Sequence, residues 1–178
     1  GLKTGFLEFW VPTFIFINRS EFALYEKDTG FQPNVSEGVL NLLSRNPEKF
    51  EIKSFKLDPI RLNIFNRYRE FLQLGQINKL GSTSFIESIK PFLVFYKGLN
   101  TYAQQTKRLS KEALSFRKAI TTAKDPEKTF FEAFPKALGF SIEALNEDKN
   151  LEQFADRLKQ CAQEINSAYD ELLKRLEM

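Results

Sequence analysis

An apolar residue recurs at every seventh position near the end of the chain, and this repeat constrains the fold more than any other feature. The repeat consists of Leu151, Leu158, Ile165 and Leu172, with Phe154, Cys161 and Ala168 between them. Such spacing keeps one apolar seam on a helix. We predict a helix over about 150–177, roughly 40 Å long at about 1.5 Å per residue. Two interpretations stay open: the long helix of an antiparallel bundle, which we favour, and a dimerising coiled coil.

Upstream of this segment the apolar residues also follow a helical period. After Asp58-Pro59, an N-cap followed by proline at the first helical position, a helix is predicted to about residue 74. A second helix is predicted over about 84–98. An apolar stripe over 109–123, begun by Ser110 or its neighbour, predicts a third. Asp125-Pro126-Glu127 starts another, which Pro135 and Gly139 close.

The first 57 residues carry the signals of a small mixed α/β unit. Aromatic and β-branched runs over 6–11 and 13–17, divided by Pro12, predict two strands, and 21–26 predicts a third. Asp28-Thr29-Gly30 is typical of a turn. Ser36 is the expected N-cap of a helix that Asn46-Pro47 ends, and 50–57 is the next predicted strand.

The predicted fold is therefore α+β and mostly helical. A small N-terminal α/β unit (1–75) packs on a C-terminal helical bundle (82–178) that ends in the long amphipathic helix, and the two parts are also compatible with one compact domain. The scarcity of valine, 4 residues against 22 leucines, agrees with a helical majority.

The sequence contains no histidine and a single cysteine. These absences exclude Ser-His-Asp and Cys-His catalysis, histidine metal sites and an internal disulfide on this chain. Glu51 and Lys53, with Asp28 upstream, match the E-x-K element of metal-dependent nucleases, in which a carboxylate binds Mg²⁺. This nuclease interpretation ranks third, because E-x-K is very common. We expect no catalytic residue beyond this candidate, no resident metal and no cofactor.

The net charge of +3 hides an uneven distribution. Residues 90–136 hold 10 basic and 4 acidic groups, whereas residues 137–178 hold 5 and 9. The basic candidates for one ridge on a helix are Lys107, Arg108, Lys111, Arg117 and Lys118. Such a ridge is able to neutralise nucleic-acid phosphates, which makes a nucleic-acid-binding module the alternative function. The simpler interpretation is that the basic ridge packs near the acidic final helix or is a solvated face.

Two adjacent aromatic residues, Phe130 and Phe131, are difficult for one helix to bury equally. Most other phenylalanines fall on apolar helical faces and predict core packing. We expect one ring of this pair to face a partner.

Three strings in the middle of the chain carry a resemblance. These are Thr106-Lys107-Arg108-Leu109-Ser110, the segment 125–132, and Pro135-Lys136-Ala137-Leu138-Gly139. The region from about Lys90 to Phe140, with a further match around Phe9-Trp10-Val11-Pro12, resembles a segment of large multidomain bacterial ATP-binding proteins. The resemblance implies a bacterial, cytoplasmic context with the nucleotide-binding elements outside this region. It transfers no functional residue, because the phosphate-binding motif is absent.

The chain begins Gly1-Leu2-Lys3-Thr4-Gly5, without an initiator methionine. Together with the resemblance, this start favours a region processed or excised from something longer. We therefore expect a non-catalytic accessory or interaction region of a larger bacterial cytoplasmic protein, such as a multidomain ATPase. Its partner is the remainder of that polypeptide or another protein, with no membrane involved. A homodimer through the 150–177 helix is not favoured.

Overall fold

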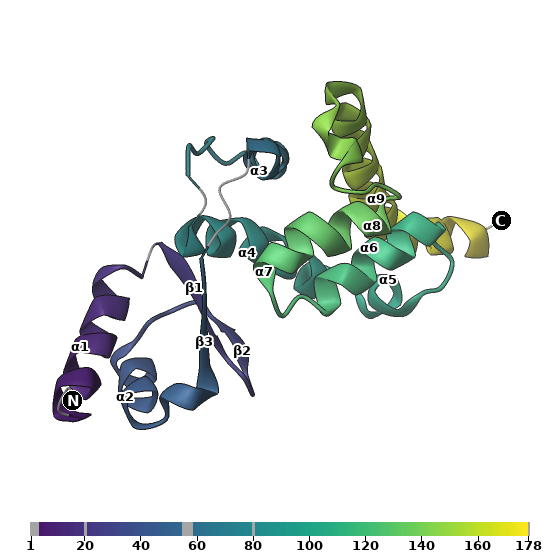
Figure 1. Ribbon diagram of the computed structural model, residues 1–178. Helices are drawn as coiled ribbons and strands as arrows, with labels where there is room; N and C mark the ends of the chain where they lie inside the picture. The colour runs from purple at the N-terminus through teal and green to yellow at the C-terminus, as the bar shows by residue number, and fades with distance from the viewer. Residues whose placement is uncertain (1–3, 20, 55–58, 80, 178) are drawn as a thin grey trace. The chain divides into compact units, whose positions relative to one another are not determined.

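The computed structural model describes residues 4–19, 21–54, 59–79 and 81–177 (Figure 1). The fold is α+β and mostly helical, as predicted, with a small sheet near the N-terminus and a long final helix. The contacts divide the chain into two compact units, the first comprising 1–57 and 79–86 and the second 58–78 and 87–178. We describe each unit by itself.

The first unit contains a three-stranded antiparallel sheet of order β2-β1-β3. Its strands are β1 (Phe22–Glu26), β2 (Gly30–Gln32) and β3 (Phe50–Ser54). The predicted strand 21–26 and the predicted turn before Gly30 are confirmed. The strand predicted over 50–57 is confirmed for 50–54, and its last three residues lie outside the described residues.

Helix α2 (Glu37–Arg45) follows the sheet's first hairpin and begins and ends where the sequence predicts. Ser36 caps it by accepting a hydrogen bond from the Val39 amide. The chain then enters a short 3₁₀ turn (Pro47–Lys49) and passes into β3. The proline at the start of this turn explains the break, since it cannot continue the α2 hydrogen-bonding pattern.

Residues 6–17 form a helix, α1 (Thr4–Ile17), and the prediction of two strands there is wrong. Aromatic and β-branched content favoured strands, but a run that is apolar on every side carries neither strand nor helix periodicity. Tertiary packing decides the outcome, because Ile15 and Val11, four residues apart on one side of the helix, pack into the core of the first unit. Thr13 donates to the Phe9 carbonyl (2.8 Å) within it.

The core of the first unit lies between one face of the sheet and the helices α1 and α2. Its buried members are Ile15, Phe22, Leu24 and Leu43, with Val11, Val35, Val39, Leu40 and Phe50 packed around them. Phe22 and Leu24 alternate with Ala23 along β1, so they share one face of the strand. Ile15 of α1 and Leu43 of α2 thus pack against this face of the sheet and complete a small apolar core.

The second unit is helical. Its principal helices are α3 (Pro59–Phe71), α4 (Ser82–Gly98), α5 (Thr101–Gln105), α6 (Lys111–Thr121) and α9 (Asp148–Leu176). The boundary between the units falls within α4, after Ile86. The helices predicted over 59–74, 84–98 and 150–177 are confirmed with small shifts of their ends, whereas α5 was not predicted. Asp58, the predicted cap of α3, lies outside the described residues.

Between α6 and α9 the chain forms one irregular helical segment. It consists of α7 (Pro126–Lys128), a π turn η2 (Thr129–Ala133) and α8 (Phe134–Ala137), followed by a 3₁₀ turn η3 (Ala144–Asn146). The predicted start is confirmed, since the Asp125 side chain accepts from the Lys128 amide (3.2 Å). Gly139 follows α8 with a positive φ of 81°, as glycine does at helix ends.

An aromatic cluster forms the core of the second unit. The ring of Tyr68 contacts four others edge-on or tilted, at centroid distances from 4.9 Å (Phe130) to 6.4 Å (Phe92). Helix α9 closes this core with the predicted seam, burying Leu151, Phe154, Leu158, Cys161, Ile165 and Ala168. Because α3 supplies Ile64, Phe65 and Tyr68, residues 58–78 group with the helical unit, whereas the sequence prediction placed the chain up to residue 75 in the first region.

Candidate functional site

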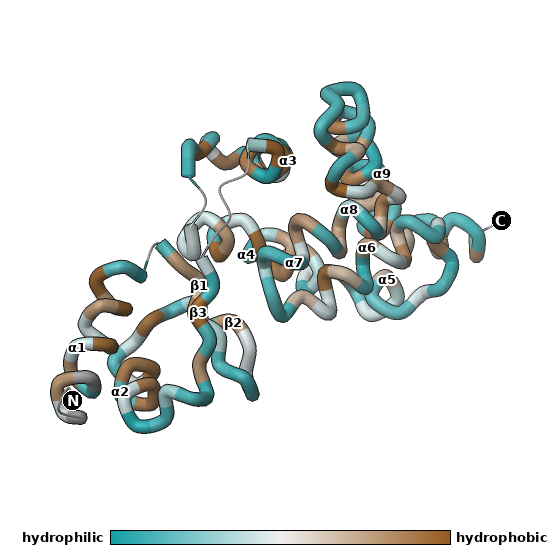
Figure 2. Tube along the Cα trace, viewed as in Figure 1, coloured by the Kyte–Doolittle hydropathy of each residue, from teal (hydrophilic) through white to brown (hydrophobic). Residues whose placement is uncertain are grey.

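The outward side of α1 carries large apolar side chains. They are Phe6, Phe9, Trp10, Phe14, Phe16 and Ile17, with exposed fractions from 46% (Phe14) to 71% (Phe9). At about 100° per residue these six fall within an arc of about 160° centred opposite the buried Ile15. We call this set the α1 aromatic face; Figure 2 shows the brown, apolar stretches of α1.

The α1 aromatic face is partly organised by its own side chains. Trp10 stacks on Phe14 with ring centroids 5.4 Å apart, and the Arg19 guanidinium lies 4.5 Å from the centroid of Phe16. A helix that is apolar on all sides is normally enclosed by protein. Contiguous exposed apolar patches are typical of interaction surfaces. This face is therefore the strongest candidate site, and the strand prediction for 6–17 missed it, although the absence of a polar stripe was a usable signal.

In the described part of the chain, no helix combines the length and hydropathy that crossing a membrane requires. Helix α1, with 14 residues and Pro12 within it, is the most apolar of them.

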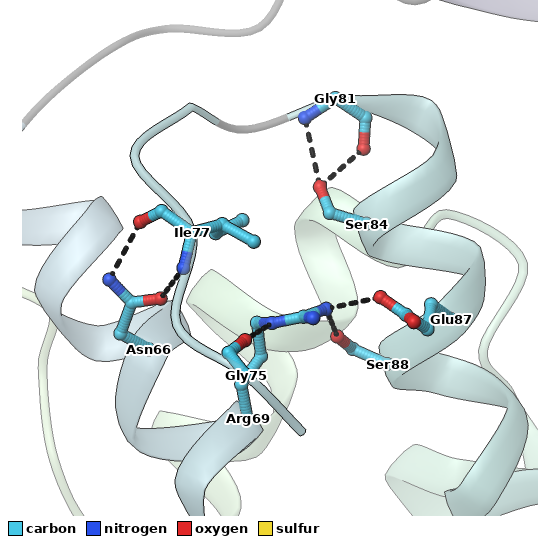
Figure 3. Close-up of polar contacts among 8 residues, drawn as sticks. All are labelled: Asn66, Arg69, Gly75, Ile77, Gly81, Ser84, Glu87 and Ser88. Atoms are coloured by element: carbon cyan, nitrogen blue, oxygen red, sulfur yellow. Dashed lines mark hydrogen bonds and ion pairs between the residues drawn. The ribbon is translucent and has the colours of Figure 1, made fainter.

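A network of polar contacts secures the passage from α3 to α4 (Figure 3). The Arg69 guanidinium is buried and donates to the Gly75 carbonyl (2.5 Å), the Glu87 carboxylate (2.7 Å) and the Ser88 hydroxyl (3.3 Å). Asn66 makes two reciprocal hydrogen bonds with the backbone of Ile77. Because every one of these contacts is internal, the network is structural.

Phe130 and Phe131 are both buried, with exposed fractions of 0% and 2%. The expectation that one ring emerges toward a partner is therefore wrong. The π turn is the physical reason: the Phe134 amide bonds to the Thr129 carbonyl, five residues back, so the wider turn points adjacent rings inward. The Arg61 guanidinium lies 5.2 Å from the ring centroid of Phe131 and also bonds to Glu127 (2.7 Å).

Pro135 removes one backbone donor from the π turn. In the π pattern the Phe130 carbonyl would accept from residue 135, which has no amide hydrogen. The Tyr68 hydroxyl supplies the missing donor at 2.9 Å. Burial raises the pKa of Tyr68 well above its ordinary value. The hydroxyl thus remains a protonated donor.

The five basic candidates do not form one helical ridge. Lys111 and Lys118 lie on α6, seven residues apart on one face, whereas Lys107 and Arg108 precede the helix. These four are exposed and make no ion pair within the described residues. Arg117 is not available, because it donates to the carbonyls of Ala103 (2.6 Å) and Thr106 (2.7 Å) at the end of α5.

The acidic final helix contacts the basic region through a cap. Glu164 on α9 accepts hydrogen bonds from the amide and the hydroxyl (2.7 Å) of Ser110, the residue that caps α6. A carboxylate at a helix N-terminus is favourable, because it faces the positive end of the helix dipole. One acidic residue of α9, Glu164, therefore stabilises the N-terminus of α6. It does not pair with the basic side chains at 107, 108, 111 and 118, which stay exposed.

Glu51 and Lys53 lie on β3, and Asp28 lies in the turn between β1 and β2. The Lys53 ammonium sits 4.1 Å from the ring centroid of Tyr25. No group of three or more carboxylate or cysteine side chains is placed to hold a metal ion among the described residues. The nuclease interpretation gains no geometric support.

The lone thiol, Cys161, lines a hollow together with Ser110, Glu112, Arg157, Gln160 and Glu164. Burial, with Glu164 and Glu112 nearby, raises the pKa of Cys161 to about 11. Its thiolate is therefore scarce at neutral pH, and the residue acts as a small apolar member of the α9 seam.

Comparison of the chain with protein-family models, with curated proteins and with solved structures finds no match.

Proposed function

We propose that this chain is a non-catalytic interaction region that docks onto another protein surface through the α1 aromatic face. The observation that carries the proposal is the exposure of six large apolar side chains on one helix. The sequence led us to expect an accessory region of a larger protein, and such a region needs an exposed surface with which to contact its partner. The α1 aromatic face is such a surface. The residues proposed to contact the partner differ from those that the sequence predicted. The sequence pointed to Phe130 or Phe131, but both are buried.

Burial energetics support a protein partner for this face. Aromatic side chains dominate interface energetics, and exposing each large apolar residue to water costs about 1.5–3 kcal/mol relative to burying it. Two of the six, Phe9 and Ile17, are more than two-thirds exposed (71% and 68%). Stacked rings such as Trp10 and Phe14 give a rigid surface that loses little entropy on binding.

The proposal also includes the kind of protein to which the partner surface belongs. We infer that the partner surface belongs to the remainder of a larger bacterial cytoplasmic protein, such as a multidomain ATPase. The resemblance of the region from about Lys90 to Phe140 is what supports this inference.

Site-specific photo-cross-linking tests the proposal. The photoreactive residue p-benzoylphenylalanine replaces Phe9 in the natural gene product, expressed in its own host, and cross-linked peptides are identified by mass spectrometry. We expect cross-links from position 9 to one reproducible protein segment outside residues 1–178. The matched control places the same residue at Val94, which is 59% exposed, lies on α4 and is not one of the residues of the α1 aromatic face.

Three outcomes would contradict the proposal. These are no cross-linking above the level of the Val94 control, cross-links confined to residues 1–178, and cross-links to lipid alone. A lipid adduct would indicate that the face lies on a membrane surface.

A second candidate function, nucleic-acid binding, rests on the four exposed basic side chains at 107, 108, 111 and 118. If they contact phosphates, affinity for a DNA duplex or single strand falls steeply between about 50 and 200 mM salt. Lys111→Glu with Lys118→Glu should abolish that binding, whereas Lys174→Glu on the far end of α9 should not. Affinity that is flat with salt, or unaffected by the double substitution, removes this candidate.

A further inference from the structure

The α1 aromatic face is wider than the stripe that a helix normally turns toward one neighbour. Its six members span an arc of about 160°, whereas the apolar stripe of a helix that packs on one surface is roughly 100° wide. Phe14 and Trp10 lie toward one edge of the arc, and Phe16 and Phe9 lie toward the other. The two edges therefore face in very different directions.

The opposite side of α1 is already covered by its own unit. Ile15 is buried in the core of the first unit, and Val11 packs against that core. A helix that is apolar on every side is normally enclosed by protein. Because one side of α1 faces its own core, a partner that encloses the rest has to curve around the helix.

The area of the face also requires that both edges be covered. With about half of each side chain exposed, the six offer roughly 100 Å² apiece, or about 600 Å² together. Covering all of it buries about 1,200 Å² when both partners are counted, which is the lower limit of specific interfaces. A flat surface that contacts a stripe of roughly 100° reaches about half of these side chains, and its total falls in the range of crystal contacts.

The polar groups on and beside the face are already paired within the helix. Thr13, which lies inside the arc, donates its hydroxyl to a backbone carbonyl of α1 (2.8 Å), and the side-chain amide of Asn18 does the same (2.9 Å). Glu8 is the single charged residue between Thr4 and Ile17, and it falls about 20° from Ile15, outside the arc. Burial of the face therefore leaves no polar side chain within the arc without a partner, and it requires no charge from the partner.

We propose that α1 docks as a helix into an uncharged, apolar groove of the partner protein. One wall of the groove contacts the edge of Phe14 and Trp10, the other wall contacts the edge of Phe16 and Phe9, and the floor contacts the middle of the arc. Trp10, Phe14 and Ile17 follow the i, i+4, i+7 spacing of helices that bind in grooves. This inference rests on the proposed function and adds the shape and the chemistry of the partner surface.

A membrane surface also covers one side of a helix, but α1 lacks the composition that such helices have. Helices that lie on a bilayer are rich in lysine and arginine on their polar face. The sequence from Thr4 to Ile17 contains neither residue type. A protein groove is therefore the occupant that the observations favour.

Photo-cross-linking from both edges of the face tests the groove in the natural gene product. The photoreactive residue p-benzoylphenylalanine replaces Phe14 in one protein and Phe16 in another, and both are compared with the protein that carries it at position 9. Positions 9 and 16 share an edge, since they are seven residues apart on the helix. We expect these two to reach one apolar segment of the partner, and position 14 to reach a second, separate apolar segment of the same partner.

Lysine substitutions at the two edges provide a second readout. Phe14→Lys and Phe16→Lys each place an unpaired charge against a wall, so each should lower the yield of cross-linking from position 9 at least about tenfold. On a flat surface only one of the two positions is covered, and only one substitution lowers the yield. The matched control is Glu8→Lys, at an exposed position outside the arc, which should leave the yield unchanged. Circular dichroism of the 178-residue chain checks that each variant is folded.

Several results would overturn the groove. Cross-links from only one edge, cross-links from both edges to one and the same segment, or sensitivity to only one of the two lysines would each indicate a flat surface. Lipid adducts from position 14 or 16 would indicate a membrane surface. If position 9 still cross-links to a protein segment outside residues 1–178, these results overturn the groove and leave the proposed function standing. Loss of the cross-link from position 9 in the otherwise unchanged protein overturns both.

Discussion

Helices α1 and α9 are both rich in apolar residues, but they place them in opposite ways. Helix α9 turns Leu151, Leu158 and Ile165 inward and leaves charged residues on the outside. Among the described side chains of α1, Ile15 alone is fully buried, and six large apolar side chains are exposed. The apolar residues of α9 complete a core within the chain, whereas most of those of α1 have no core to complete here. Apolar content alone therefore does not distinguish a helix that completes a core from a helix that exposes its apolar face.

The aromatic cluster and the α1 aromatic face should respond very differently to truncation. Phe134→Ala removes a ring that is 0% exposed and lies 5.0 Å from both Phe92 and Phe116. We expect a loss of about 3–5 kcal/mol in the free energy of unfolding, from lost burial and the cavity left behind. Urea unfolding followed by near-ultraviolet circular dichroism measures it. A loss below about 1 kcal/mol would contradict the assignment of this cluster as the core.

The aromatic cluster of the second unit also differs from the α1 aromatic face in containing a buried polar contact, the hydrogen bond of the Tyr68 hydroxyl. Tyr68→Phe leaves the Phe130 carbonyl without its donor and should cost about 1–3 kcal/mol. Phe134→Leu provides a control that keeps this hydrogen bond.

The pH dependence of the same variant gives a second test. Burial raises the pKa of Tyr68 above 10.0, so above that pH the unfolded chain releases a proton that the folded chain retains. The contribution of Tyr68 to the free energy of unfolding should therefore be fully present below pH 10 and decrease as the pH rises further. Tyr68→Phe should make the alkaline loss of stability smaller. An identical alkaline slope in both proteins would show that Tyr68 is not the group responsible.

The smallest effect is expected on α1. Phe9→Ser combined with Ile17→Ser changes two side chains that are 71% and 68% exposed. The free energy of unfolding should change by less than about 1 kcal/mol in total, since exposed substitutions are usually within ±0.5 kcal/mol each. A large loss of stability would mean that these residues are core, and the contrast with α9 would disappear.

Local signals in the sequence predicted much of this fold. The α9 seam, the caps Ser36, Ser110 and Asp125, and the strand at 22–26 are each specified by residues close together in the chain. Residues 6–17 were misassigned because an all-round apolar run contains no period, and only the distant core residues Phe22, Leu24 and Leu43 decide its form. The burial of Phe130 and Phe131 also depended on a distant residue, since Tyr68 supports the π turn from α3.

The candidate site was less predictable than the fold. Arg117 looked like a surface charge, but the carbonyls at the end of the unpredicted helix α5 hold it. The α1 aromatic face was hidden by the strand assignment, because strands would have buried alternate residues. In both cases the error lay in an element whose existence depends on tertiary contacts.

Trp10 provides the most direct test of the central claim that the α1 aromatic face is covered by another protein surface. It is the only tryptophan of the 178 residues, is 49% exposed and lies within that face. Iodide quenching of its fluorescence is measured in this chain alone and in the natural gene product, with any other tryptophan there replaced by phenylalanine. We predict efficient quenching alone, and a blue-shifted emission with quenching reduced several-fold in the natural product. Equal quenching and unchanged emission in the two proteins would contradict the account.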